Sequence, residues 1–170
     1  WNDEIFRLGQ CVEQAVRVME GAVEKRRAVS LSAAVEEPLP LVRADPDRIV
    51  QVVVNLVGNA LKFTETGEVR VEVRPDRRGG VSVSVEDTGP GISERDRERL
   101  FERFHQGSDA RHRPAGTGLG LAICREIVEH YGGVIRAVPR QGPGSRFVFS
   151  LPGVGVPAGA ETHAVERRAP

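Results

Sequence analysis

A helix-like stretch of the sequence, residues 52–64, carries two asparagines and a lysine among aliphatic residues. At 100° per residue, Asn55, Asn59 and Lys62 fall on one stripe of the helix, and apolar side chains cover the rest of its surface. Asparagine is a poor residue inside a helix because its amide competes for backbone hydrogen bonds. The stripe therefore indicates a surface that faces a group needing amide oxygens, although a solvated helix face would show the same pattern.

Two glycine-containing segments add further candidate binding residues. In "DTGPG", the carboxylate of Asp87 ends a predicted strand, and Gly89 and Gly91 let the backbone approach a planar ligand. In "GTGLGLAI", glycines open a predicted helix, whose first N–H groups and positive dipole end favour a phosphate. These glycines are Gly116, Gly118 and Gly120. Each segment alone is also consistent with an ordinary turn or a flexible helix cap.

The order of these segments excludes two common phosphate-binding folds. A dinucleotide-binding fold places its glycines directly after the first strand of a parallel βαβ unit, whereas here they come late and follow an irregular loop. A Walker loop needs Gly-Lys-Ser or Gly-Lys-Thr, and the sequence contains neither. The glycines therefore belong to another kind of site.

Hydrophobic periodicity predicts the elements that position these residues. Strict alternation indicates strands, and a period near 3.6 indicates helices. The expected helices span 11–27, 46–64, 94–104 and 119–133, and the expected strands span 28–37, 67–75, 80–87, 133–139 and 145–152. Asp45 is the expected N-cap of the second helix, with Pro46 at its first position. Gly132 and Gly133 are expected to close the last helix.

The composition bounds the class of protein. A chain of 170 residues is long enough for one core-forming domain. Its 24 basic and 24 acidic side chains cancel, so there is no electrostatic case for binding nucleic acid or an anionic membrane. Cys11 and Cys124 lie far apart, which excludes a disulfide framework or a zinc spacing and favours a cytoplasmic setting. No apolar run is long enough to span a membrane, although a membrane anchor elsewhere in a longer parent stays open.

Taken together and in this order, the motifs resemble those of the ATP-binding catalytic domain of sensor histidine kinases, a branch of the Bergerat-fold (GHKL) ATPases. The resemblance runs from about Asp45 to Leu151, and "DPDRIVQVVVNLVGNALKFT" and "GTGLGLAICREIVEHYGG" are similar to the family over their whole lengths. With the predicted elements, it implies an α/β two-layer sandwich. Three main helices would cover one face of a mixed, mostly antiparallel sheet of about five strands. The implied cofactors are ATP and Mg²⁺.

The resemblance assigns a role to each part of this set. Asn55, Asn59 and Lys62 would be the catalytic residues. Asn59 would offer its amide oxygen to Mg²⁺, Asn55 would support the metal shell, and Lys62 would meet a phosphate oxygen. Asp87 would accept a hydrogen bond from the adenine amino group. The residues implied to bind the nucleotide are Asp87, Gly89, Gly91, Ile92, Phe104, Gly116, Thr117, Gly118, Leu119, Gly120 and Leu121.

The stretch 105–116 is polar, contains glycine and has no periodicity. The resemblance implies that it is a lid over the nucleotide, hinged by the glycines at its end, and that Phe101 and Phe104 fix its near end to the domain. Many relatives carry a phosphate-contacting arginine where this chain has Gln106. That contact could be supplied instead by a neighbouring arginine, namely Arg103, Arg111 or Arg113.

Asn55 also separates this chain from the hydrolytic members of the same superfamily. In those ATPases, and in the serine kinases of anti-sigma type, a glutamate at this place acts as a general base on water. An amide cannot take up a proton at neutral pH. The resemblance therefore implies a protein-histidine kinase that keeps its phosphoryl group for another acceptor. A degenerate nucleotide-binding interaction module and a hydrolytic ATPase of the same fold stay open as alternatives.

No histidine in the chain fits a phosphoacceptor: two lie in the expected lid, one near a helix end and one in the tail, namely His105, His112, His130 and His163. The expected partners are a dimerising helical domain of the same parent, which carries the acceptor histidine, and a response regulator. Residues 1–10 are expected to connect to that domain, 11–152 to form the catalytic domain, and 153–170 to form a disordered tail or linker. The fragment is expected to be monomeric and its parent a homodimer.

Overall fold

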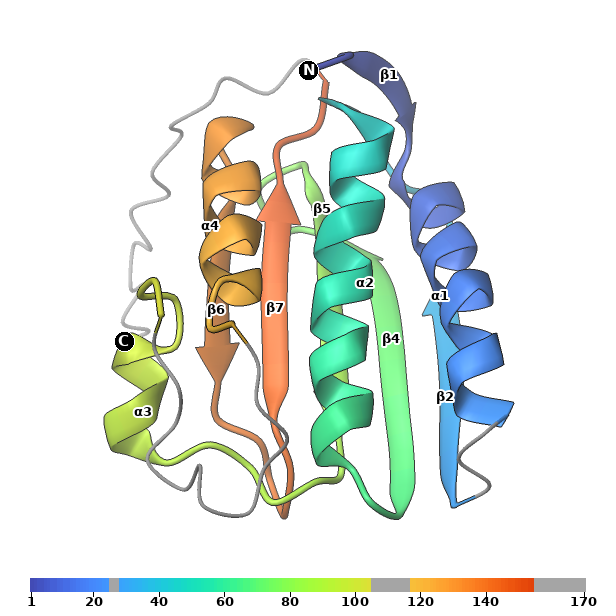
Figure 1. The fold of residues 1–170 in the computed structure, drawn as a ribbon. Helices are drawn as coiled ribbons and strands as arrows, with labels where there is room; N and C mark the ends of the chain where they lie inside the picture. Colours follow the sequence, from blue (N-terminus) through green and yellow to red (C-terminus); the bar gives the residue numbers. More distant parts are fainter. Residues whose placement is uncertain (25–27, 105–116, 155–170) are drawn as a thin grey trace, which may run out of the picture.

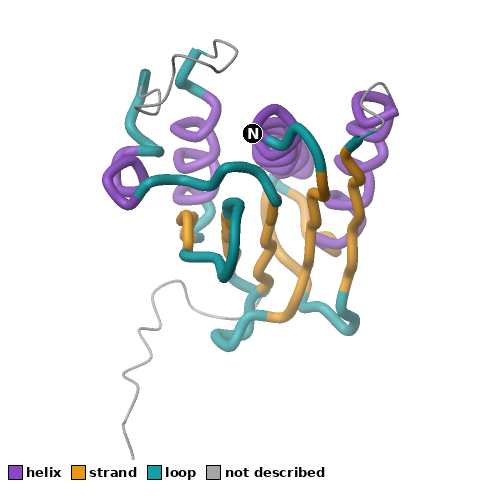
Figure 2. Tube along the Cα trace, turned by 90° about the horizontal axis from the view of Figure 1, so that it is seen from below, coloured by secondary structure: helices purple, strands orange, loops and turns teal. Residues whose placement is uncertain are grey.

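The chain folds into two layers, a five-stranded sheet and a layer of helices (Figure 1, Figure 2). A computed structural model describes residues 1–24, 28–104 and 117–154. In spatial order, the strands of the sheet are β2 (Val29–Val35), β4 (Gly67–Pro75), β5 (Val81–Asp87), β7 (Arg146–Leu151) and β6 (Val134–Val138). β2 pairs with β4 in parallel, and the other neighbours pair antiparallel. The prediction of a mixed, mostly antiparallel sheet of about five strands is confirmed.

Three long helices cover one face of this sheet, as predicted (Figure 2). They are α1 (Leu8–Glu24), α2 (Pro46–Phe63) and α4 (Gly120–His130), and α2 lies in the middle. The short helix α3 (Glu94–Arg99) ends before the predicted residue 104, because the chain turns there and buries Phe101. Of the helices in the described ranges, none combines the length and the apolar character needed to cross a bilayer.

The predicted caps fix the ends of the two helices that carry most of the candidate site. At the start of α2, Asp45 Oδ1 accepts hydrogen bonds from the N–H groups of Asp47 (3.0 Å) and Arg48 (3.3 Å). At the end of α4, Gly132 has a φ of 71°, and both Gly132 and Gly133 donate backbone hydrogen bonds into the last turn. This pairing closes a helix most readily when glycine takes up the positive φ.

A second, two-stranded sheet departs from the prediction. β1 (Glu4–Arg7) pairs antiparallel with β3 (Leu41–Ala44), in stretches expected to be a connection and a turn. Such short strands, one of them lying between prolines, show too little alternation to be recognised. Helix α1 likewise begins at Leu8 and not at Cys11, because the Leu8 side chain is fully buried. Residues 4–8 thus pack on the domain, and their connection to an upstream helical domain stays a prediction.

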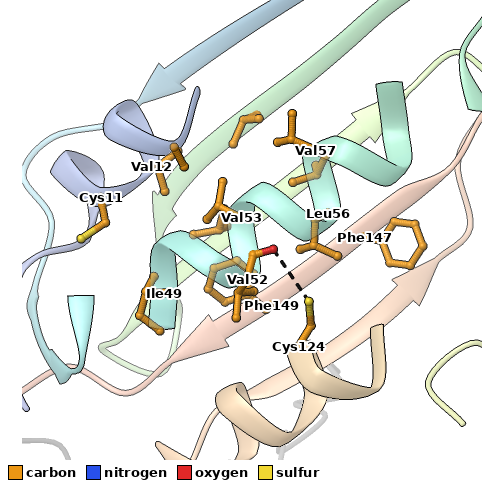
Figure 3. Close-up of a cluster of buried hydrophobic side chains, with 14 of the residues drawn as sticks. Cys11, Val12, Ile49, Val52, Val53, Leu56, Val57, Cys124, Phe147 and Phe149 are labelled. Atoms are coloured by element: carbon orange, nitrogen blue, oxygen red, sulfur yellow. Dashed lines mark hydrogen bonds between the residues drawn. The ribbon is translucent and has the colours of Figure 1, made fainter. Parts of the chain in front are cut away.

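The core lies between α2 and the sheet (Figure 3). Phe149 of β7 and Val12 of α1 are fully buried on either side of α2. Cys124 of α4 joins this core, where its thiol donates a hydrogen bond to the Val52 carbonyl oxygen (3.8 Å). Cys11 is buried as well, and its thiol is free. The side chains that α2 buries are Ile49, Val52, Val53, Leu56, Val57, Ala60 and Leu61.

Leu56→Ala is expected to destabilise the domain by about 2–5 kcal/mol, because it removes buried methyl groups and leaves a cavity in the core. The measurement is the free energy of unfolding, from urea titration followed by circular dichroism. Val18→Ala in α1 is the matched control: Val18 is 64% exposed, and its truncation is expected to change the stability by no more than about 0.5 kcal/mol. Equal losses in the two variants would contradict the central position of α2.

Candidate functional site

The predicted site residues gather toward one end of the domain, shown at the bottom of Figure 1. Helix α2 ends there at Phe63, strand β5 ends at Asp87, and the turn 139–145 joins β6 to β7. Helix α4 begins above this end and runs away from it. Segments far apart in the sequence thereby supply side-chain amides, a carboxylate and a helix N-terminus to one region.

The polar stripe of α2 lies between buried neighbours. Asn55, Asn59 and Lys62 are half-buried, whereas the aliphatic residues between them are buried. Asn55 faces the start of α4, since a Cβ added to Gly120 would lie 3.8 Å from its Cγ. Its amide also forms a hydrogen bond with the Cys124 thiol, which acts against the burial that raises the pKa of this thiol to about 12. The structure thus brings Asn55 and Gly120 together, and the alternative of a solvated helix face does not hold for Asn55.

Asp87 carries a buried carboxylate, and the residue is only 4% exposed. Its Oδ1 accepts hydrogen bonds from the backbone N–H groups of Gly89 (2.9 Å) and Ser145 (3.2 Å). Burial raises the pKa of Asp87, while these hydrogen bonds, and lastly the charge of Arg140, act in the opposite direction. A buried acid at the end of a strand is a candidate for binding a donor group of a ligand.

Gly89 and Gly91 have reasons within the fold to be glycine. A Cβ on Gly89 would lie 2.9 Å from the Phe63 carbonyl oxygen. Gly91 has a φ of 84°, and its Cβ would lie 3.0 Å from the Gly144 carbonyl oxygen. Larger residues would push the segment 88–91 away from α2 or from the turn 139–145. Ile92 follows this segment and packs against the core. Contact of the two glycines with a planar ligand stays a prediction.

The N-terminus of α4 lacks the side-chain cap that the other helices near the site have. Leu119 occupies the N-cap and makes no side-chain hydrogen bond to the helix, whereas the Ser93 hydroxyl accepts from a backbone N–H group of α3. Gly118 has a φ of 67° and turns the chain into α4. Thr117 is exposed and Leu121 is half-buried against the core. An uncapped helix N-terminus presents N–H groups that can satisfy an anion.

The two phenylalanines expected to fix the lid behave differently. Phe101 is buried and lies edge-on to Phe147, with ring centroids 6.3 Å apart. Phe104 is 73% exposed, so its side chain does not fix the chain to the domain as expected. Its backbone N–H donates instead to the Gly118 carbonyl oxygen (3.0 Å). Phe104 also adopts a φ of 63°, which is uncommon for a residue other than glycine and which the sequence did not predict.

Several predictions about the lid lie outside the described residues. They concern the lid at 105–116 itself, Gly116, Gln106, Arg111 and Arg113. Arg103, the remaining candidate for the missing phosphate contact, forms an ion pair with Glu126 of α4.

The sequence did not predict that Ser145 and Arg140 are neighbours of Asp87. The segment "RQGPG" indicates only a turn. Contact between residues so far apart in the sequence leaves no local pattern.

Comparison with known proteins identifies relatives over most of this chain. The family model described as "Histidine kinase-, DNA gyrase B-, and HSP90-like ATPase" matches residues 44–154. Sensor histidine kinase AruS of Pseudomonas aeruginosa is 54% identical over 106 residues, which cover 59% of this chain and 11% of AruS. Sensor histidine kinase RcsC of Escherichia coli is 39% identical over 129 residues, covering 75% of this chain and 14% of RcsC. The chain thus spans only a small part of these relatives.

Solved structures agree with this match. The catalytic domain of histidine kinase ThkA has a TM-score of 0.77 and 31% sequence identity, covering 90% of this chain and 99% of that chain. Full-length ShkA in complex with AMPPNP has a TM-score of 0.78 and 34% identity, covering 89% of this chain and 31% of that chain. The two-layer fold described above is the fold of these catalytic domains.

Asp87→Asn is expected to raise the midpoint of thermal unfolding at neutral pH. The pKa of Asp87 is raised in the fold, so the ionised carboxylate lowers the stability of the folded state at neutral pH. This loss of stability becomes smaller as the pH falls through the folded pKa toward the ordinary value of 3.8. Asparagine keeps an oxygen acceptor without the charge, so its advantage should shrink on acidification. Glu65→Gln, which removes a charge from an exposed side chain, is the control. A variant less stable than this control at neutral pH would contradict the burial argument.

Proposed function

The chain belongs to the family of histidine kinase-, DNA gyrase B- and HSP90-like ATPases, as the ATP-binding catalytic domain of a sensor histidine kinase, and we propose that it transfers the γ-phosphoryl group of Mg²⁺-bound ATP to a histidine on a separate helical domain. The phosphoryl group would then pass to an aspartate of a response regulator. The observation that supports this function is that α2 contacts both other parts of the site. Asn55 faces Gly120 at the uncapped start of α4, and the Phe63 carbonyl oxygen lies against Gly89, two residues after buried Asp87.

Each part of this site suits one part of the nucleotide. Asp87, with Oδ1 held by two N–H groups, would accept a hydrogen bond from the adenine amino group. Lys62, in the last turn of α2, would place its charge near a phosphate. The N-terminus of α4, beginning at Gly120, would donate backbone N–H groups to the phosphates. Phosphoryl transfer of this kind depends mainly on positioning and on stabilising negative charge.

The donor set also fits magnesium. No cluster of three or more His, Cys, Asp or Glu side chains that could hold a metal is found within residues 1–24, 28–104 and 117–154. Mg²⁺ takes oxygen ligands, keeps several waters and is commonly held by one or two protein oxygens together with phosphates. Asn59 would supply such an oxygen, with Asn55 in support from the preceding turn. When bound, the ion would neutralise charge on the phosphates.

The chain's own residues suit transfer to a separate acceptor better than transfer to water. Asn55 offers an amide, which cannot act as a base, and it is engaged with Cys124 of α4. Within the described ranges, the only histidine is His130. It lies at the far end of α4 and stacks on Trp1, with ring centroids 4.0 Å apart. The acceptor histidine is therefore assigned to the helical domain of the same parent, a homodimer in this proposal.

Calorimetric titration with AMPPNP, with and without Mg²⁺, tests the nucleotide site. Asn59→Ala should weaken binding by about tenfold when Mg²⁺ is present and should leave binding in EDTA nearly unchanged, because it removes one metal ligand. Asp87→Asn should weaken binding by about tenfold under both conditions, because it replaces an acceptor by a group that also donates. Glu65→Gln is the control. No binding by the unaltered chain would favour the alternative of a degenerate interaction module.

Hydrolysis of ATP by the purified chain is expected to be slow, below about 0.01 s⁻¹, against about 1–100 s⁻¹ for kinases acting on their acceptors. The reason is that Asn55 supplies no base for water. Asn55→Glu adds a carboxylate at this position and should raise the rate, whereas Asn55→Gln, of similar size, should not. The assay is phosphate release at saturating Mg²⁺-ATP. Rapid hydrolysis by the unaltered chain would favour a hydrolytic ATPase.

A further inference from the structure

The turn between β6 and β7, residues 139–145, folds directly onto Asp87. The backbone N–H of Asp87 donates to the Ser145 carbonyl oxygen (3.0 Å), and the Ser145 N–H donates to Asp87 Oδ1 (3.2 Å). Gly144 lies so close that a Cβ there would be 1.8 Å from the Asp87 carbonyl oxygen. The position of this turn therefore decides the direction in which the carboxylate points.

The Arg140 side chain contacts both this turn and strand β5. Its Nη1 donates a hydrogen bond to the Pro143 carbonyl oxygen across the turn. Its Nε lies 3.6 Å from Glu86 Oε2, and the Arg140 side chain is only 20% exposed. Glu86 is the residue before Asp87 in β5, so one side chain joins the tip of the turn to the strand that carries the carboxylate. An ion pair that is largely withdrawn from solvent constrains its partners more than an exposed pair does.

Arg146 provides a comparison within the same cluster. Its Nε lies 3.0 Å from Glu86 Oε1, so it contacts the same carboxylate as Arg140 does. Its backbone, however, is fixed in β7 between two strands, opposite Glu86 on one side and Val138 on the other. Arg140 lies beyond the end of β6, where no strand pairing holds the chain. Loss of the Arg140 side chain should therefore loosen the turn, whereas loss of Arg146 should not.

The charge of Arg140 also acts on Asp87. Burial raises the pKa of Asp87, and the opposing groups are the Gly89 N–H, the Ser145 N–H and hydroxyl, and the Arg140 guanidinium. The effect of the guanidinium on the pKa is the smallest of these, but it alone carries a full charge. It therefore adds to the geometric effect of the turn by favouring the ionised carboxylate, which accepts hydrogen bonds and donates none.

We propose that Arg140 is a positioning residue for the base of the nucleotide, which holds the turn 139–145 against β5 so that Asp87 presents a fixed acceptor to an amino-purine. This inference rests on the proposed function, since it assigns selectivity to the same site. A fixed, ionised carboxylate favours adenine, whose exocyclic amino group donates, over hypoxanthine, whose oxo group cannot. A displaced or protonated carboxyl would lose that preference.

The test compares the affinities of the chain for ADP and IDP by calorimetry across a range of pH. Arg140→Gln should weaken ADP binding by about fivefold and leave IDP binding nearly unchanged, so the ADP/IDP selectivity falls. ADP binding should also be lost at a higher pH on acidification, because the pKa of Asp87 rises without the nearby cation. Arg146→Gln is the matched control, and its selectivity should stay within about twofold of the unaltered chain.

Arg140→Lys separates the two contributions. Lysine keeps the charge but not the planar fork that spans Pro143 and Glu86, so the pH of half-maximal ADP binding should stay near that of the unaltered chain while selectivity falls. This variant also carries the test if Arg140→Gln does not fold. Unchanged selectivity in a folded Arg140 variant, whatever its melting temperature, would overturn the inference while leaving the proposed function intact. Absence of ADP binding by the unaltered chain would overturn both.

Discussion

Helix α2 can be buried only along the apolar part of its surface, and this constraint sets the geometry of the rest of the domain. Its aliphatic side chains meet the sheet, while α1 and α4 pack on either side. One direction then remains for Asn55, Asn59 and Lys62, which are half-buried. Any other rotation of the helix would bury polar groups without partners, at about 1–3 kcal/mol for each group. The burial that stabilises the fold therefore also orients the site.

Asp87 shows the opposite relation between stability and function. Its burial disfavours the charge, and the fold offsets this with N–H groups from both sides, Gly89 and Ser145. Those donors reach the carboxylate because the chain approaches too closely for side chains at Gly89 and at Gly144. A buried carboxylate such as that of Asp87 destabilises the fold, so packing alone does not explain its presence. A role in binding a ligand does explain it.

Local patterns were sufficient for the elements, but not for the contacts between distant segments. Alternation in 67–75 predicts β4 with its observed bounds, and Asp45 marks the start of α2, because both signals are carried by adjacent residues. The pair β1–β3 is too short for such a signal. The closeness of Asp87 to Ser145 depends on strand order, which periodicity does not encode. Grouping the asparagine stripe with Asp87 and the glycines accordingly required the family resemblance.

The spacing between α2 and α4 is set by contacts at two separated levels along these helices. Near the site, the Cys124 thiol donates to the Val52 carbonyl oxygen, and Asn55 faces Gly120. At the far end, the Tyr131 hydroxyl accepts a hydrogen bond from the Asp45 N–H (3.0 Å), at the residue that caps α2. Because an α-helix is stiff over this length, contacts at two separated points fix both its distance and its tilt. The amide stripe and the start of α4 are therefore held in register by the fold before any nucleotide binds.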